Sequence, residues 1–185
     1  MKRLVVLVSG SGSNLQALLD HQAELGARVV LVVSNKPGVR ALERASRAQV
    51  ESWVHPTEPD RRAYDRKLAG RVAEARPDLV VLAGFMRILT TEFLDCFPGR
   101  VVNLHPALPG QYPGLDAIAR ALHDGRQETG CMVHYVVPEV DAGPVIDIEK
   151  VPIHPEDTLE SLSERMHQAE HRLLVRAVGL ALGHA

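Results

Sequence analysis

The chain is organised by short, continuous apolar runs that each end at a turn signal. Four of these runs are well defined, at residues 4–9, 29–34, 79–84 and 100–105. They lack the alternation of polar and apolar residues that marks a strand with one wet face. Such runs are typical of strands buried on both faces, as in a parallel sheet covered by helices. A weaker strand is expected at residues 51–55.

Helical patterns lie between the apolar runs. One apolar stripe is formed by Leu15, Leu18 and Leu19, and a second by Tyr64, Leu68, Val72 and Ala75. Alternating strands and helices predict an α/β fold with a doubly wound, mostly parallel sheet and right-handed crossovers.

The last third of the chain changes style. Residues 131–137 and 144–153 predict two neighbouring strands joined by a loop at 138–143, which makes an antiparallel element near the C-terminal end. A long helix is expected over residues 157–182, with Asp157 or Thr158 as its N-cap. We expect residues 1–185 to form a single domain with one substantial core.

Composition narrows the classes of partner. The chain is 45% hydrophobic and 24% charged, with a net charge of -2 and no basic run, so no nucleic-acid partner is expected. The apolar run near the N-terminus is too short for a signal peptide, and no stretch approaches the roughly 20 residues that span a membrane. Cys96 and Cys131 form no metal or redox motif. Together these features predict a cytoplasmic protein.

Asn103 and His105 stand at the end of one predicted strand. Residues two apart in a strand point to the same face, so this amide and imidazole should project side by side before Pro106. An isolated pair of this kind more often satisfies local backbone groups. In open α/β sheets, however, ligands bind beyond the carboxyl ends of the strands. That position makes both residues candidates for a functional site.

The first predicted strand runs into a glycine-rich stretch, SGSGSNLQAL at residues 9–18. Gly10 and Gly12 allow a tight turn, and the helix that begins near Ser13 offers free N–H groups to an anion. Leu15 stands where a dinucleotide fingerprint has its third glycine, and no acidic residue follows the second strand. The stretch therefore favours a phosphate or small-anion site over a nicotinamide site, with a plain tight turn as the alternative.

A competing motif lies in the predicted last helix. The stretch HQAEH at residues 167–171 matches the pattern of an inverted zinc peptidase. Such a site needs a third, usually acidic, ligand downstream, and no Asp or Glu follows His171. We therefore interpret the stretch as a polar helix face with Glu170 turned to a pocket, and we expect no metal.

Four stretches taken together carry a family resemblance. Residues 9–18, 81–89, 102–114 and 140–146, in this order, resemble the phosphoribosylglycinamide formyltransferases of the folate-dependent formyltransferase family. The resemblance implies a Rossmann-like formyltransferase fold with a nucleotide-binding N-terminal half and a folate-binding, catalytic C-terminal half. It also implies 10-formyltetrahydrofolate as cosubstrate, glycinamide ribonucleotide as acceptor, no metal, and a monomer or homodimer that takes part in purine biosynthesis.

The resemblance also assigns roles to residues. It implies that Asn103, His105 and Asp141 are catalytic, with His134 as a possible helper. Gly12, Ser13 and Asn14 would hold the phosphate of the ribonucleotide, and Glu170 would bind near its ribose. The residues implied for folate are Arg61, Met86, Arg87, Ile88, Leu89, Asn103, Val140, Ala142 and Gly143. A carboxylate close to His105 would favour the imidazolium, so we expect Asp141 to raise the pKa of His105.

The chain departs from the family pattern after the histidine, where HPALPG replaces the common HPSLLP. Ala107 removes a hydroxyl, Pro109-Gly110 replaces Leu-Pro, and Ala142 stands where glycine is frequent.

Two related enzymes share the Asn, His and Asp set. Methionyl-tRNA formyltransferase and formyltetrahydrofolate deformylase each carry an extra domain, for which we expect no room between residue 9 and residue 185. A catalytically silent sugar-nucleotide-binding module is an alternative of a different class, and the intact set of three residues argues against it.

Overall fold

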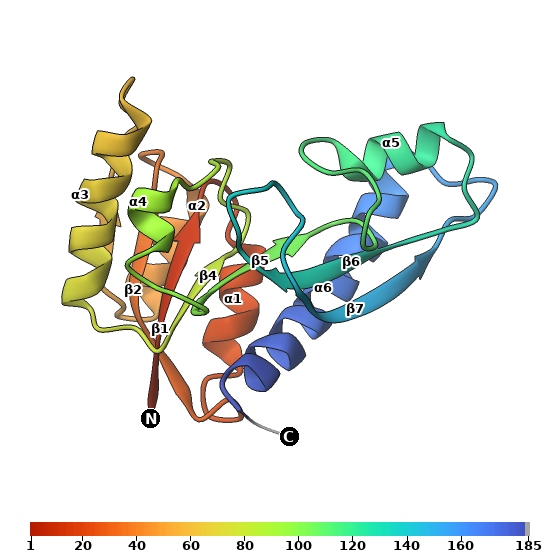
Figure 1. The fold of residues 1–185 in the computed structure, drawn as a ribbon. Coiled ribbons are helices and arrows are strands. Elements are labelled where there is room, and N and C mark those ends of the chain that lie inside the picture. Colours follow the sequence, from red (N-terminus) through yellow and green to blue (C-terminus); the bar gives the residue numbers. More distant parts are fainter. Residues whose placement is uncertain (184–185) are drawn as a thin grey trace.

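A computed structural model of the chain describes residues 1–183. Within these residues, one sheet has the strand order β3-β2-β1-β4-β5-β6-β7 (Figure 1). The first five strands in this order are parallel, whereas β6 pairs antiparallel with both β5 and β7. The strands are β1 (Lys2–Val8), β2 (Ala27–Ser34), β3 (Ser52–Val54), β4 (Leu79–Leu82), β5 (Val101–His105), β6 (Glu128–Tyr135) and β7 (Val145–Pro152). The predicted fold class is confirmed.

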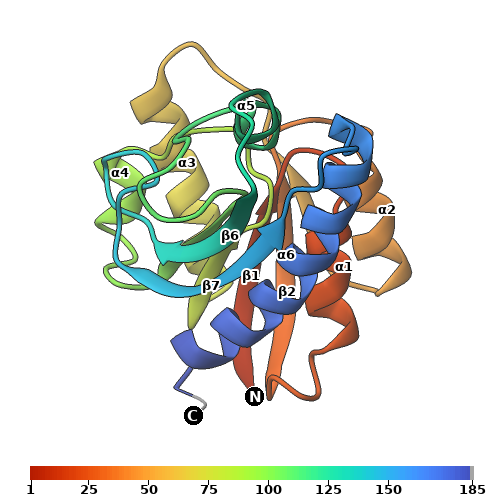
Figure 2. The same ribbon diagram turned by 90° about the vertical axis from the view of Figure 1, so that its right-hand side faces the viewer.

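Helices cover both faces of the sheet (Figure 2). One face carries α1 (Ser13–Asp20), α2 (Arg40–Arg47) and α6 (Leu159–Ala181). The opposite face carries α3 (Arg61–Glu74) and the short α4 (Thr91–Leu94). A further short helix, α5 (Ala117–His123), follows the loop after β5. No helix in the described part of the chain is long and apolar enough to cross a membrane.

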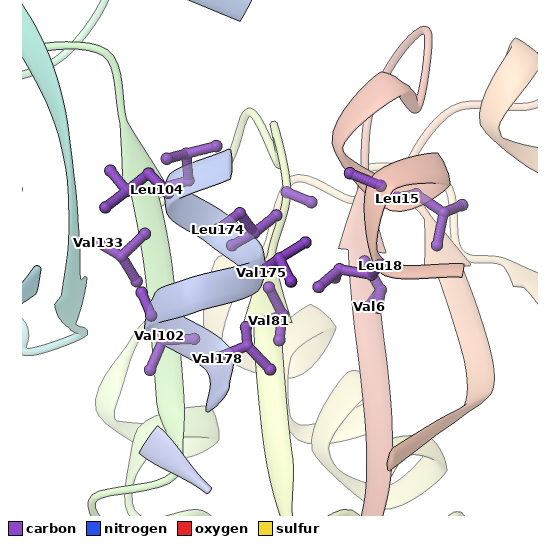
Figure 3. Packing of buried hydrophobic residues seen from close by; sticks show 14 of the residues in the cluster. Val6, Leu15, Leu18, Val81, Val102, Leu104, Val133, Leu174, Val175 and Val178 are labelled. Atoms are coloured by element: carbon purple, nitrogen blue, oxygen red, sulfur yellow. The ribbon is translucent and has the colours of Figure 1, made fainter. Parts of the chain in front are cut away.

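The two-sided cover explains the continuous apolar runs. In β1, Leu4 and Val6 pack on the side of α1 and α6, while Val5 and Leu7 pack on the side of α3, and all four are fully buried. Figure 3 shows Leu174, Val175 and Val178 of α6 next to Val81 of β4 and to Val102 and Leu104 of β5. Strands that bury both faces leave no position for a polar side chain until they end.

The last helix begins and ends within the predicted range. Thr158 is its N-cap, and the Thr158 hydroxyl and the Ser161 hydroxyl each accept a hydrogen bond from the other residue's backbone N–H, which makes a capping box. The prediction offered Asp157 or Thr158, and the structure selects Thr158. β6 begins at Glu128, three residues before its predicted start at Cys131.

The carboxyl ends of β1, β4 and β5 border the region where polar side chains gather. The strand order reverses direction between β1 and β4, which is where open α/β sheets form a binding crevice. The last residue of β4, Leu82, pairs with Asn103, so β5 continues for two residues beyond its neighbour. This overhang brings His105 to the crevice while its strand remains paired with β6.

Candidate active site

A cavity of about 460 Å³ opens beyond the carboxyl ends of β4 and β5. Its walls come from residues 84–89, 103–106, 114–117 and the 134–141 region. Its polar lining includes the side chains of Asn103, His105, His134 and Asp141. Four of the large apolar side chains that are exposed to solvent also line it, namely Met86, Ile88, Leu115 and Val140. The cavity therefore combines an apolar entrance with a small polar cluster.

The Asp141 carboxylate joins the predicted catalytic residues. Its Oδ1 accepts a hydrogen bond from Nδ2 of Asn103 at 3.3 Å, and its Oδ2 lies 3.4 Å from Nδ1 of His105. The Gly114 N–H also donates to Oδ2, at 2.9 Å. Asp141 belongs to the loop between β6 and β7 and has a left-handed φ of 53°. The structure thus brings Asn103, His105 and Asp141 together, from two places 36 to 38 residues apart in the chain.

His134 belongs to the same cluster. It lies directly across from Asn103 in the β5–β6 register, and its Nε2 is 3.2 Å from the Asn103 amide nitrogen. Its Nδ1 is 2.9 Å from the Tyr135 carbonyl, which can only accept, so in the neutral ring Nδ1 is the donor and Nε2 the acceptor. Both amide hydrogens of Asn103 therefore have partners, one in His134 and one in Asp141.

Asp141 acts on the pKa of His105 in the expected direction, but the net shift of that pKa is downward. The Asp141 charge does act to raise this pKa, and so does the hydrogen bond to the Tyr112 carbonyl, but burial of the ring outweighs them and lowers the pKa. Burial acts to raise the pKa of Asp141, yet its contacts with His134 and Gly114 and the charge of His105 leave that pKa lowered. At neutral pH the site therefore holds an ionised Asp141 beside a neutral His105.

The segment at 86–89, implied for folate, is held against α3. A guanidinium nitrogen of Arg61 donates to the Ile88 carbonyl at 3.1 Å, and the Arg87 guanidinium lies 3.9 Å from the centroid of the Tyr64 ring. Met86 and Ile88 are exposed, whereas Leu89 is buried. The structure therefore brings Arg61 to the cavity wall formed by this segment, although Arg61 does not line the cavity itself.

The opposite wall comes from the loop between β6 and β7. Val140 is half exposed and lines the cavity, Ala142 is exposed, and Gly143 is buried. A Cβ atom at Gly143 would lie 1.7 Å from the Tyr135 carbonyl oxygen, so the close approach of the loop to β6 requires glycine there. The substitution at Ala142 falls on an exposed position of this loop.

The glycine-rich stretch lies on the α1 side of the crevice, outside the cavity lining. Gly12 is the N-cap of α1 with a φ of 73°, and a Cβ atom there would approach the Ala41 Cα of α2 to 2.7 Å. The packing of α1 against α2 therefore requires a glycine at this position, whether or not a ligand binds there. Ser13 and Asn14 form the first turn of α1, where backbone N–H groups have no partners within the helix.

Glu170 faces the same helix end. It is 6% exposed, and its Oε2 accepts a hydrogen bond from Nδ2 of Asn14 at 3.2 Å. Burial raises the pKa of Glu170. The Oδ1 atom of Asn14 is buried and has no hydrogen-bond partner within residues 1–183. A polar ligand with a hydroxyl group would satisfy that atom. His167, which shares the HQAEH stretch, is exposed.

A serine that the sequence interpretation missed connects the two parts of the crevice. The Ser9 hydroxyl donates to Oδ1 of Asn35 at 2.5 Å and accepts from the Met86 N–H at 2.8 Å. Ser9 and Asn35 directly follow β1 and β2, and both are buried. The signal in the sequence was a polar residue directly after an apolar run, which occurs at both Ser9 and Asn35.

The departure from the family pattern has a local structural reason. The Gln111 N–H donates to the Leu108 carbonyl at 3.0 Å, and Gly110 has a φ of 74°. Proline at the second position and a left-handed glycine at the third suit a type II turn. This turn leads the chain back so that the Tyr112 carbonyl lies 2.9 Å from Nε2 of His105. That main-chain contact is a second feature that residue types did not reveal.

Within residues 1–183, no three His, Cys, Asp or Glu side chains are grouped so that they could hold a metal ion. His167 and His171 therefore have no third side chain of these types grouped with them in the described part of the chain.

Comparison with known proteins identifies the class to which this fold and site belong. The formyl transferase family model matches residues 2–178, so the chain belongs to the formyl transferase family. Within that family it is 43% identical to the phosphoribosylglycinamide formyltransferase of Dictyostelium discoideum, over 96% of this chain and 96% of that protein. The resemblance expected from the four stretches is confirmed.

Other relatives agree. The chain is 46% identical, over 97% of its length, to the trifunctional purine biosynthetic protein adenosine-3 of Drosophila melanogaster, but it spans only 14% of that longer protein. The solved structure of glycinamide ribonucleotide transformylase 1 from Symbiobacterium toebii superposes with a TM-score of 0.95 at 42% identity. That match covers 98% of this chain and 88% of the other.

Proposed function

We propose that this chain transfers the formyl group of 10-formyltetrahydrofolate to the amine of glycinamide ribonucleotide, as a phosphoribosylglycinamide formyltransferase of cytoplasmic purine biosynthesis. One observation carries the proposal. Asn103, His105 and Asp141 meet within hydrogen-bonding reach at a cavity, in a chain that is similar over nearly its whole length to enzymes of that name.

The cavity suits the donor. A folate presents a flat heterocycle with polar edges, and pockets for such ligands combine apolar walls with a few fixed polar groups. Here Asn103, His105 and Asp141 supply polar groups, and Met86, Ile88 and Val140 supply apolar contact. Arg61 and Arg87 lie on or beside the same wall and can pair with the carboxylates of the folate tail.

The acceptor fits the α1 side of the crevice. The phosphate of the ribonucleotide would bind the free N–H groups at Gly12, Ser13 and Asn14, where the helix dipole favours negative charge. Glu170 would accept hydrogen bonds from the ribose hydroxyls, and so would Oδ1 of Asn14, which has no partner within residues 1–183. The Ser9 bridge keeps this end next to the folate wall. The glycinamide amine can then reach the cavity.

His105 is suited to take the proton first. Its Nε2 donates to the Tyr112 carbonyl, so the lone pair of the neutral ring is on Nδ1. As the amine nitrogen forms its bond to the formyl carbon, Nδ1 accepts the amine proton. The imidazolium that results has the Asp141 carboxylate 3.4 Å away, which stabilises the new charge.

Asn103 is suited to stabilise the oxyanion. Its amide hydrogen bonds to His134 and Asp141 measure 3.2 and 3.3 Å, which is long for such bonds. A negatively charged oxygen is a stronger acceptor than the ring nitrogen of a neutral His134, and the bond to it would be shorter. Exchanging one long bond for this one stabilises the transition state more than the ground state. The proton on Nδ1 then passes to the leaving nitrogen as the bond from the formyl carbon to that nitrogen breaks.

The direct test is to incubate the purified protein with 10-formyltetrahydrofolate, with and without glycinamide ribonucleotide, and follow loss of the formyl group. We expect loss only when the ribonucleotide is present, with formylglycinamide ribonucleotide as the product. Release of formate without the ribonucleotide would identify a deformylase. Ribonucleotide binding without formyl transfer would identify a silent binding module, and either result would contradict the proposal.

Removal of metal provides a second test, because it separates this reaction from zinc hydrolysis. We expect protein treated with a chelator to retain its full rate of formyl transfer, since Glu170 is assigned to substrate and no step uses a metal. The measurements are the metal content of the purified protein and the rate before and after treatment. Activity lost to the chelator and restored by zinc would contradict the assignment of Glu170.

A further inference from the structure

A main-chain carbonyl determines which nitrogen of the neutral His105 ring carries the hydrogen. Nε2 of His105 lies 2.9 Å from the Tyr112 carbonyl oxygen. Because a carbonyl only accepts, this contact favours the tautomer with hydrogen on Nε2 and the lone pair on Nδ1. Nδ1 is the nitrogen that lies 3.4 Å from Asp141. Loss of the Tyr112 contact would allow the other tautomer, in which Nδ1 carries hydrogen and cannot accept a proton.

Regular secondary structure does not hold that carbonyl in place. Tyr112 belongs to the loop between β5 and α5, and its φ of 44° is in the left-handed region. This conformation is uncommon for a bulky residue and has an energetic cost. The position of the carbonyl must therefore be maintained by other contacts of the residue.

The Tyr112 side chain makes several such contacts. Its hydroxyl donates to Oδ2 of Asp124 at 2.8 Å and accepts from Nε of Arg126 at 2.6 Å. The guanidinium groups of Arg120 and Arg126 each lie 5.3 Å from the ring centroid, within range of cation–π attraction. Arg120 also donates to the Pro113 carbonyl at 2.8 Å. We refer to Asp124, Arg120 and Arg126 as the tyrosine clamp.

We propose that Tyr112 is a positioning residue, whose side chain is held by the tyrosine clamp so that its carbonyl stays on Nε2 of His105 and leaves Nδ1 free to accept the proton. The contribution to catalysis rests on the proposed function, whereas the control of the tautomer does not. The other titratable or charged groups that act on the His105 ring are Asp141, His134 and Arg120. The clamp therefore acts on His105 through geometry and, at Arg120, also through charge.

The test uses ¹⁵N NMR of the histidine rings in the free protein. The signals of His105 are assigned as those that disappear in the His105→Gln variant. In the unaltered protein we expect a protonated Nε2 and an unprotonated Nδ1 above the His105 pKa. Tyr112→Gly removes the side chain but accepts the left-handed φ without strain. We expect its two ring nitrogens to give averaged shifts that indicate mixed tautomers, with kcat lowered about 3- to 10-fold and both KM values within about 2-fold.

Further variants separate the clamp from general loosening. Tyr112→Phe keeps the ring within reach of both arginines and should give a smaller change in the same direction. Asp124→Asn weakens the hydrogen bond that the Tyr112 hydroxyl donates to the exposed Asp124. This variant provides the test if Tyr112→Gly fails to fold. Lys150→Gln, which breaks an exposed ion pair with Glu128 on nearby strands, is the matched control and should leave the His105 shifts unchanged.

Two results would overturn the proposal. If the His105 tautomer in a folded Tyr112→Gly or Asp124→Asn variant is that of the unaltered protein, the carbonyl needs no clamp. If the tautomers are mixed and kcat is unchanged, Nδ1 is not the proton-accepting nitrogen. A protein that performs no formyl transfer at all would refute the proposed function and leave the NMR result standing, so the two failures are distinguishable.

Discussion

Replacing His105 by alanine is expected to lower kcat by about 10²- to 10⁴-fold, the usual range for loss of a general acid–base group. The proton of the attacking amine would then have no acceptor at the reacting atoms. The ring is buried within a cluster of three other polar side chains, so the variant's folding should be checked from its melting temperature. Steady-state rates with both substrates, measured at saturation, give the comparison.

Asp141→Asn is expected to lower kcat by a large part of the same factor of about 10²–10⁴. It keeps the shape of the side chain but removes the charge that opposes the effect of burial on His105. The pKa of His105, already lowered, should therefore fall further, and the acidic limb of the pH profile should move to lower pH. Because the neutral ring is the proposed base, kcat/KM should fall as the pH drops through the His105 pKa. The kcat reached at high pH should also be lower, because the imidazolium formed during the reaction no longer has a carboxylate beside it.

The combination tests whether the two residues act as a unit. The double variant should lose little more than His105→Ala alone, because groups that act together are not additive. Asp95→Asn, an exposed aspartate outside the cavity lining, is the matched control and should leave the profile unchanged. An Asp141→Asn variant whose His105 titrates as in the unaltered protein would show that the carboxylate acts other than by charge.

Gly12→Val is expected to damage the fold as well as the anion site. The left-handed φ of 73° costs about 1–2 kcal/mol for a residue with a Cβ atom. The approach to Ala41 at 2.7 Å adds an overpacking cost of about 1–3 kcal/mol. The melting temperature should fall by several degrees, and activity with both substrates should decrease together.

Gly10→Ala provides the contrast. A Cβ atom at Gly10 has nothing within 4 Å, and Gly10 is not among the glycines with positive φ. We expect this variant to keep its melting temperature and to raise the KM for the ribonucleotide, since the added methyl group lies beside the proposed phosphate site. Thermal unfolding and separate KM values for the two substrates distinguish the cases. A stable Gly12→Val protein would contradict the steric explanation.

The strands were predictable because burial on both faces removes polar residues from them. Leu4 to Val8 and Leu79 to Leu82 read as unbroken apolar runs for this reason. The helices α4 and α5 were missed because they have 4 and 7 residues, too few for an apolar period to be recognised. The long α6 shows several periods and was predicted nearly to its ends.

The candidate site was predictable where it depends on residue type and not where it depends on burial or the main chain. Asn103 and His105 share a strand end, so their proximity followed from strand geometry. The effect of Asp141 on the pKa of His105 followed from the sequence, but the net shift did not, because sequence does not give the degree of desolvation that outweighs the carboxylate. The Tyr112 carbonyl was missed because any residue at that position has one.

The position of Asn103 and His105 on an interior strand determines how heat should inactivate the protein. β5 is hydrogen-bonded to β4 on one side and β6 on the other, and its apolar residues are buried. Elements of this kind open at a free energy close to that of global unfolding, whereas surface loops open at much lower cost. Moderate warming should therefore first weaken the loops that are proposed to recognise the two substrates. Asn103 and His105, the proposed oxyanion-binding and proton-accepting groups, should hold their relative positions until the sheet itself melts.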